Sequence, residues 1–216
     1  VFNVTVPAGT PNCYIIGDWD GWSQFTEMTK VDDTHYTVTI PDVCATSAKY
    51  KYCYGPSWGC QEVKSTSIPT EGISDRTYSS SDNVVAWISY YIVGYNNNWD
   101  YNNGYKFDIN GNLNVHLATV KEHDFKIKSS MEDVYTTDSQ DGEKHKFNRS
   151  HTSEYIPQTD ASWHNLKLNV DVAGYYDFTF NPVNKLLTIV FPSKGYRLKI
   201  TMTDGSGKVY TSNEVN

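Results

Sequence analysis

The chain has 216 residues, 38% of them hydrophobic, and a formal net charge of −7. The length suits one large or two small domains, and the acidic balance argues against nucleic acid or an anionic membrane surface as partner, which favours a neutral or apolar ligand. No stretch approaches the ~20 consecutive apolar residues that cross a bilayer, so we expect no membrane insertion by this chain.

Alternation of apolar and polar residues dominates the pattern along the chain, and such alternation is typical of half-buried strands. It occurs at residues 36–40, 50–54, 113–117, 125–127, 166–172, 176–180 and 187–191. Turn-forming residues separate these runs at 31–35, 109–112, 181–185 and 204–207. With no clear amphipathic helix, the sequence predicts an all-β protein built of immunoglobulin-like β-sandwich modules in tandem.

A weak internal repeat sets the predicted domain organisation. The sequence "YIIGDWDGW" at 14–22 returns as "YIVGYNNNW" at 91–99, and "YKY" at 50–52 returns as "FKI" at 125–127. We therefore predict one module at 1–86, a second at 87–192, and a C-terminal hairpin at 193–216 that packs on the second module or opens a further one.

A long polar stretch at 129–165 shows little periodicity. A loop of this length inside a compact domain is either functional or disordered, and both readings stay open.

The four cysteines, Cys13, Cys44, Cys53 and Cys60, all fall in the first predicted module. An even, clustered set is compatible with disulfides in an exported protein. Zinc is the alternative, but the spacing lacks a CxxC pair and no histidine is close in sequence. The motif "DWDG" resembles the start of a calcium loop without the later acidic ligands. We predict no metal and no cofactor.

Two tryptophans are expected on turns, where an aromatic ring has little structural use. Trp22 follows "GDWDG", and Trp58 lies in "YGPSWGC". If Tyr50 and Tyr52 face the core, Lys51 between them faces outward. An indole presents a flat apolar face that can stack on the C–H face of a glucose ring, and two indoles at an angle suit a curved α-glucan, while a lysine can donate to sugar hydroxyls.

The first module resembles the starch-binding module families related to the glycogen-binding domain. The resemblance is carried, over residues 10–80, by "YIIGDWDGW", "HYTVTIP", "KYKY", "SWGCQE" and "DRTY". It implies a small β-sandwich with a ligand site at Trp22, Lys51 and Trp58. Asp75 stands where these families have an asparagine, which puts its contact in question. Trp19 is a further candidate, although we expect it to pack under the loop while Trp22 faces the ligand.

The second module is more similar to the sandwich modules of surface starch-binding lipoproteins of the SusE/SusF type. Trp99 corresponds to Trp22, and Lys126 to Lys51. Nothing aromatic stands at the counterpart of Trp58, so its substitutes are sought among residues nearby. The candidates are Tyr101, Tyr135 and Trp163.

The sequence contains no GxSxG, HExxH or P-loop motif and no evident pair of facing carboxylates, so we predict a protein that is not an enzyme. The predicted function is non-catalytic binding of α-1,4-glucan, at a bacterial cell surface or outer membrane or as a secreted protein, with other surface glycan-uptake proteins as further partners. Three alternatives remain: an accessory arm of a glycoside hydrolase, an immunoglobulin-like spacer with buried tryptophans and no ligand, or binding of another glycan such as a β-glucan or a host oligosaccharide.

Overall fold

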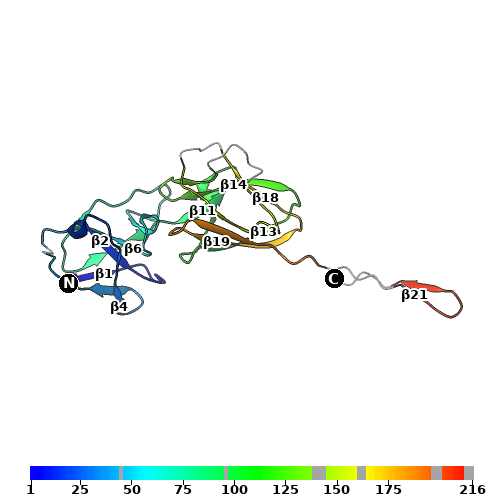
Figure 1. Cartoon of the computed structure of the whole chain (residues 1–216), viewed down its shortest axis with the longest axis horizontal. Helices are drawn as coiled ribbons and strands as arrows, with labels where there is room; N and C mark the ends of the chain where they lie inside the picture. The colour runs from blue at the N-terminus through cyan, green and yellow to red at the C-terminus, as the bar shows by residue number, and fades with distance from the viewer. Residues whose placement is uncertain (44–45, 95–96, 138–144, 160–163, 196–200, 212–216) are drawn as a thin grey trace.

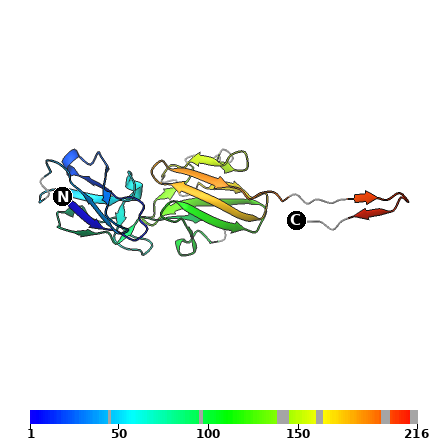
Figure 2. The same cartoon turned by 90° about the horizontal axis from the view of Figure 1, so that it is seen from below.

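The computed structural model describes residues 1–43, 46–94, 97–137, 145–159, 164–195 and 201–211. Within these residues the regular structure is β-strand apart from three single turns of 3-10 helix, η1 (Asp18–Asp20), η2 (Trp58–Cys60) and η3 (Tyr101–Asn103). The strands form two sandwiches that lie end to end, the first drawn blue to cyan and the second green to orange (Figures 1 and 2). The predicted all-β sandwich fold is confirmed.

The first sandwich consists of two four-stranded sheets. One sheet has the order β4-β5-β1-β9, with β4 (Thr29–Lys30), β5 (His35–Val38), β1 (Phe2–Thr5) and β9 (Asp82–Asn83). The other has the order β3-β2-β6-β8, with β3 (Thr26–Glu27), β2 (Tyr14–Gly17), β6 (Lys49–Cys53) and β8 (Arg76–Thr77). A short antiparallel pair, β7 (Glu62–Val63) with β10 (Ala86–Trp87), leads out of this sandwich.

The second sandwich repeats this plan with longer strands. One sheet has the order β12-β11-β14-β18-β16, with β12 (Tyr105–Lys106), β11 (Tyr90–Val93), β14 (Glu122–Ser129), β18 (Leu166–Asn169) and β16 (Lys146–Phe147); β15 (Val134–Tyr135) also pairs with β14. The facing sheet has the order β13-β19-β20-β17, with β13 (Asn112–Leu117), β19 (Gly174–Asn181), β20 (Leu186–Val190) and β17 (Ser153–Tyr155).

Each sandwich has its own cluster of buried apolar side chains, as expected when alternating strands turn one face inward. In the first, Tyr50 and Tyr52 of β6 are fully buried, as the alternation predicted. Trp87 belongs to this cluster and is 8% exposed, whereas Ala86 belongs to the second cluster. The two clusters therefore interleave at these residues, and the boundary between 86 and 87 stays a prediction.

Within its described residues, the polar stretch at 129–165 contains short strands as well as loops. It contributes β15, β16 and β17, and these short strands pair with both sheets of the second sandwich. The C-terminal segment forms the predicted hairpin, with β21 (Thr201–Thr203) antiparallel to β22 (Val209–Thr211). Residues 201–209 are all exposed, and Figure 1 shows the hairpin projecting away from both sandwiches.

Candidate functional site

The loop after β2 folds back toward its own strand and fixes Trp22. Asp18–Asp20 forms a single helical turn that Gly21 closes by donating its N–H to the Asp18 carbonyl at 3.2 Å. The Trp22 N–H then donates to the Gly17 carbonyl at 2.9 Å, with Trp22 itself at φ 63°. This left-handed backbone holds the indole half-exposed at the surface of the β3-β2-β6-β8 sheet.

Trp58 reaches the same place from the hairpin that follows β6. The hairpin closes when Tyr54 donates its N–H to the Cys60 carbonyl at 3.0 Å. Trp58 is 42% exposed, and its ring centroid lies 6.0 Å from that of Trp22 with the two planes tilted by 41°. Phe25 supports Trp58 edge-on at 5.6 Å. The structure therefore brings the two predicted tryptophans together as an angled, exposed pair.

Lys51 and Asp75 form a second contact on the outer side of this sheet. Lys51 pairs with Ile16 across β2 and β6 and points away from the buried Tyr50 and Tyr52. Its Nζ lies 3.4 Å from Asp75 Oδ1, with the lysine side chain 19% and the aspartate side chain 51% exposed. An ammonium group has three N–H donors, so one ion pair leaves donors of Lys51 for a ligand. We call Trp22, Lys51, Trp58 and Asp75 the first face.

Trp19 does not belong to the tryptophan pair. Its ring lies over Gly17, where any Cβ would overlap it, and 5.7 Å from the ring of Phe2. It is half-buried against the core of the first sandwich. This is the packing role that the sequence favoured for Trp19.

The equivalent sheet of the second sandwich has the same strand order and the same register. Ile16 pairs with Lys51 in the first sandwich, and Val93 pairs with Lys126 in the second. The register of β3 on β2 matches that of β12 on β11, and the register of β8 on β6 matches that of β18 on β14. These matching pairings support the predicted duplication and identify equivalent residues directly.

The second face resembles the first at its tryptophan and lysine. Trp99 has φ 64°, like Trp22, and is 41% exposed, while its ring lies over Gly94 as the ring of Trp19 lies over Gly17. Lys126 Nζ lies 5.0 Å from the centre of the Trp99 ring, and Lys128 Nζ lies 4.4 Å from that of Tyr101. Three of the five predicted residues, Trp99, Tyr101 and Lys126, therefore come from adjacent parts of one surface. With Lys106 and Lys128 they form what we call the second face.

Two other predictions for the second module fare differently. Tyr135 is wrong as a ligand contact, because it is 2% exposed and packs edge-on against Tyr90 and Phe180 in the core. The second hairpin spans five residues, 129–133, where the first spans seven, 54–60, so the segment that carries Trp58 is shortened and places Tyr135 on an inward-facing strand. Trp163 lies outside the described residues.

Three residues in or beside the second face escaped the sequence reasoning: Lys106, Lys128 and Asn165. By register, Arg76 is equivalent to Leu166, so Asn165 stands in the place of Asp75. Its side-chain amide donates to Asp124 Oδ2 at 3.3 Å. The asparagine that the resemblance expects before the last strand of this sheet, and that the first module lacks, is present in the second. Counting back from "LKL" at 166–168 would have found it.

The described cysteines do not form the expected disulfides. Cys13, Cys53 and Cys60 are free buried thiols, and burial raises the pKa of Cys60 to about 12; Cys44 lies outside the described residues. Burial in apolar surroundings makes such thiols unreactive. Among the described residues, no group of three His, Cys, Asp or Glu side chains could hold a metal ion, and no helix is long and apolar enough to cross a membrane.

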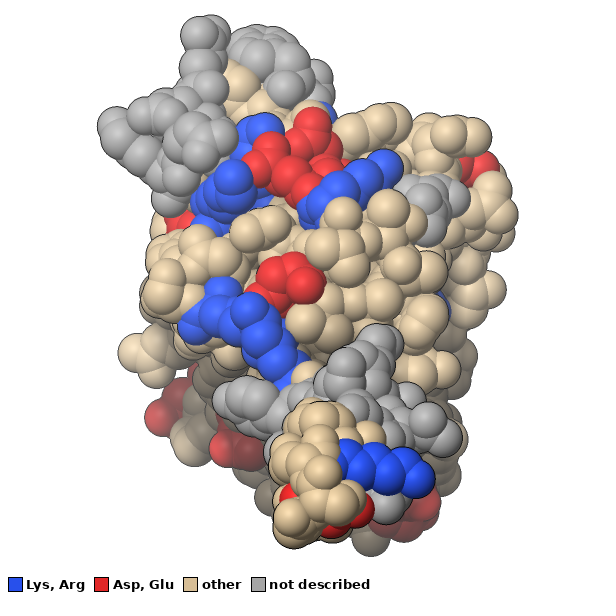
Figure 3. All heavy atoms as spheres, turned by 90° about the vertical axis from the view of Figure 1, so that its right-hand side faces the viewer, with Lys and Arg blue, Asp and Glu red and all other residues tan. Residues whose placement is uncertain are grey.

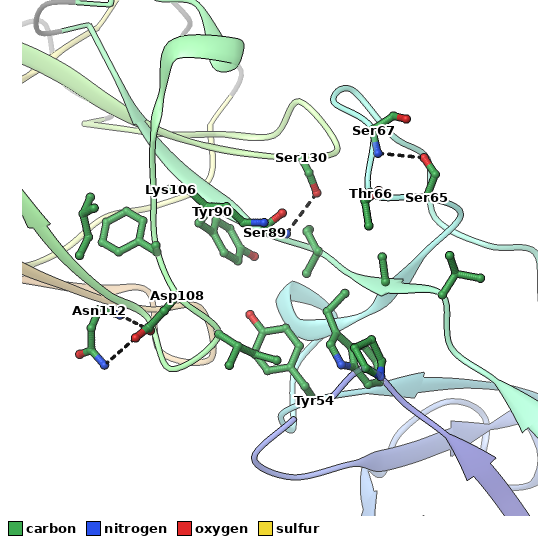
Figure 4. Close-up of a pocket in the computed structure, with 18 of the residues that line it drawn as sticks. Tyr54, Ser65, Thr66, Ser67, Ser89, Tyr90, Lys106, Asp108, Asn112 and Ser130 are labelled. Atoms are coloured by element: carbon green, nitrogen blue, oxygen red, sulfur yellow. Dashed lines mark hydrogen bonds between the residues drawn. The ribbon is translucent and has the colours of Figure 1, made fainter. Parts of the chain in front are cut away.

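A cleft between the two sandwiches was not anticipated from the sequence. Its volume is about 580 Å³, and Figure 4 shows its walls. Tyr54 lies on one side, Tyr90 on the other, and Ser65, Ser67 and Ser130 at its hydroxyl-rich end. The floor is apolar and is made of side chains that also join the two cores. We attribute the cleft to the joint between the sandwiches.

The fold and its surface define an all-β protein of two sandwiches with exposed aromatic side chains on one sheet of each. No family model and no curated protein matches the chain. Among solved structures, the crystal structure of SusF from Bacteroides thetaiotaomicron is similar with a TM-score of 0.34 and 11% identity over 95% of this chain. The chain spans about half, 54%, of that structure. Because this likeness is weak, we base the function on the geometry of the two faces.

Proposed function

We propose that this chain is a non-catalytic glycan-binding protein and that its first face binds α-1,4-linked glucan. The observation that carries the proposal is the exposed Trp22–Trp58 pair, with ring centroids 6.0 Å apart and planes tilted by 41°. A monomeric protein gains little from such a pair in water, whereas two tilted apolar planes fit successive rings of a curved sugar chain. Lys51 adds a charged donor for hydroxyl groups.

The exposure of the tryptophans also favours binding over a spacer role. A spacer without ligand would keep its indoles in the core, as it does Trp87, but Trp58 and Trp99 are 42% and 41% exposed. Display at a bacterial surface, alongside other glycan-uptake proteins, is part of the same proposal.

Affinity electrophoresis in gels with and without amylopectin tests the proposal. The intact chain should be retarded, and Trp58→Ala should reduce its affinity at least ~10-fold, because central aromatic anchors carry most of the binding energy. Tyr175→Ala is the matched control, because Tyr175 is 64% exposed on β19, in the sheet of the second sandwich that carries neither face. An intact, folded chain that is not retarded, or equal losses in both variants, would contradict the α-glucan assignment. Trp99→Ala in the same gels reports whether the second face contributes.

A further inference from the structure

The equivalent faces of the two sandwiches carry different charge. Tyr14 of β2 is flanked across the sheet by Glu27 and Cys53. Its counterpart Tyr91 of β11 is flanked by lysines instead, at positions 106 and 128. Residues that pair directly across a sheet share one face, so a carboxylate and a thiol in the first sandwich have been replaced by two ammonium groups in the second.

A third position changes in the same direction. Lys51 of the first face has an ion-pair partner in Asp75, whereas Lys126 of the second has the neutral Asn165 in the equivalent place. Asp124 is the acidic residue next to these positions on β14. It accepts a hydrogen bond from the Asn165 amide and forms an ion pair with Lys167, whose Nζ lies 3.7 Å from its Oδ1. Register-equivalent positions therefore hold balanced charge on the first face and excess positive charge on the second.

The lysines of the second face are positioned by aromatic rings. Lys106 Nζ lies 5.9 Å from the centre of Tyr91, and Lys128 Nζ lies 4.4 Å from the centre of Tyr101. A ring holds an ammonium group in place without neutralising its charge. Within the described residues, neither Lys106 nor Lys128 forms an ion pair with a carboxylate. Each ammonium group is thus held by a ring rather than by a carboxylate.

Lys126 lies buried beneath the second face and close to Lys128. It is 7% exposed, and burial, followed by the charge of Lys128, lowers its pKa. Asp124 acts in the opposite direction. Glu132 and Asp133 lie near the Tyr101 hydroxyl, and Asp133 already accepts hydrogen bonds from Ser129 and Gln158. An anion bound over this face would relieve the repulsion between the two lysines.

Elsewhere on the second sandwich the charges are balanced locally. Glu122 pairs with Lys146 and Lys167, and Asp171 pairs with Arg149 and Lys194. Figure 3 shows acidic and basic side chains next to one another on this end of the molecule. Lys106 of β12 and Lys128 of β14, which lack such a carboxylate partner among the described residues, are therefore a local feature in a chain whose net charge is −7.

We infer that the second face binds an acidic glycan, with a sugar ring stacked on Trp99 and a ring carboxylate or sulfate held by Lys106 and Lys128. This rests on the proposed glycan-binding function and extends it, because the two faces would then take ligands of different charge. The exposed indole favours a sugar chain over a bare anion. The overall acidity of the chain disfavours a general attraction to polyanions.

Isothermal titration calorimetry with defined oligosaccharides tests the inference. The probes are an α-1,4-linked hexagalacturonide, its neutral methyl ester, a heparin-derived hexasaccharide and maltohexaose. The intact chain should bind at least one acidic probe and bind the methyl ester at least ~10-fold more weakly. Lys106→Glu with Lys128→Ala should weaken the acidic probe at least ~10-fold, since each charged donor is a strong contact, and leave maltohexaose unchanged. The galacturonide and heparin arms distinguish carboxylate from sulfate.

Lys121→Glu is the matched control, because Lys121 is exposed on the same sandwich but outside the face. Lys106→Gln with Lys128→Gln repeats the test without charge reversal, and circular dichroism verifies each fold. An intact chain that binds neither acidic probe, an equal loss in Lys121→Glu, or equal competition by single-stranded DNA of the same charge would overturn the inference. If Trp58→Ala loses only maltohexaose binding and still binds the acidic probe, the two ligands bind at different faces. Lysine-dependent acidic binding without any maltohexaose binding would refute the α-glucan assignment alone.

Discussion

At the scale of single residues, the repeated glycine explains why the chain uses nearly the same sequence twice. Gly17 leaves room for the ring of Trp19, and Gly94 leaves room for the ring of Trp99. In each sandwich, therefore, a tryptophan ring packs against the backbone of a glycine at the end of β2 or just after β11. Any side chain at the glycine would move the ring, so the motif couples the packing of β2 and β11 to the loops that shape the two faces.

We predict that Gly94→Ala destabilises the protein and displaces Trp99. A Cβ at this position would lie 2.7 Å from the Asp124 carbonyl oxygen and 2.8 Å from the Trp99 ring, and Gly94 has φ 121°, a conformation that alanine rarely adopts. The expected loss is about 1–3 kcal/mol, the usual cost of a strained backbone position. Urea unfolding measures it. Gly205→Ala, in open space, is the control, and similar free energies of unfolding in both variants would contradict the account.

A second prediction concerns the donor role of Lys51. Lys51→Met keeps the apolar stem but removes the ammonium, so maltoheptaose should bind roughly tenfold more weakly, the loss of one charged hydrogen bond of about 1.5 kcal/mol or more. Calorimetric titration measures the affinity. Lys64→Met removes an ion-paired lysine that lies away from the face, with its side chain 53% exposed, and should have no effect. Unchanged binding in Lys51→Met would remove this residue from the site.

At the scale of elements, a buried polar network ties together four strands of the first sandwich. Arg76 of β8 donates to Glu62 of β7 at 2.6 Å and to Asp82 of β9 at 3.1 Å. The hydroxyls of Tyr50 and Tyr52, both in β6, donate to the other Asp82 oxygen at 2.7 and 2.9 Å. Both carboxylates are buried, and the Arg76 guanidinium offsets the desolvation cost of their negative charge.

Arg76→Met should therefore cost about 3–5 kcal/mol, the range for removing one partner of a buried ion pair. The loss should depend on pH. Burial raises the pKa of Glu62 above 4.5 and Arg76 opposes that rise, so the variant should raise it further. With a raised pKa, the Glu62 carboxyl stays protonated to higher pH in the folded state than in the unfolded state. Its contribution to the free energy of unfolding therefore declines as pH rises above 4.5. Urea unfolding of Arg76→Met at pH 5 and pH 7 should show a smaller deficit at pH 5. An equal deficit at both would exclude Glu62 as its cause.

Strand alternation and the spacing of a few residues were sufficient to predict much of this architecture. Tyr50 and Tyr52 inward, Lys51 outward, and the pairing of Trp22 with Trp58 are all direct consequences of period two and of turn positions. The short strands of the polar stretch escaped prediction, because two or three residues are too few to show a period. Tyr135 was misassigned for a related reason: sequence distance does not show that a hairpin has lost two residues.

At the scale of the whole molecule, the joint between the sandwiches is built from backbone and core. Tyr90 of β11 donates its hydroxyl to the Gly59 carbonyl at 2.6 Å, and Thr70 donates its N–H to the Ser130 carbonyl at 2.8 Å. Val63 of β7 belongs to the core of the second sandwich. Such shared burial joins the modules more firmly than a flexible linker would, and it holds the two faces in a fixed relation.

We therefore predict that the two sandwiches unfold together. Differential scanning calorimetry should show one transition with matching calorimetric and van't Hoff enthalpies, and Arg76→Met, which acts in the first sandwich only, should lower the Tm of the whole transition. Tyr90→Phe should weaken the coupling between the two sandwiches. It removes the hydrogen bond to the Gly59 carbonyl, which should lower the free energy of unfolding by about 1 kcal/mol. Tyr155→Phe, at an exposed position on β17, is the control. Two resolved transitions in the intact chain, with only one shifted by Arg76→Met, would mean that the sandwiches are independent and that the angle between their faces is free to follow the ligand.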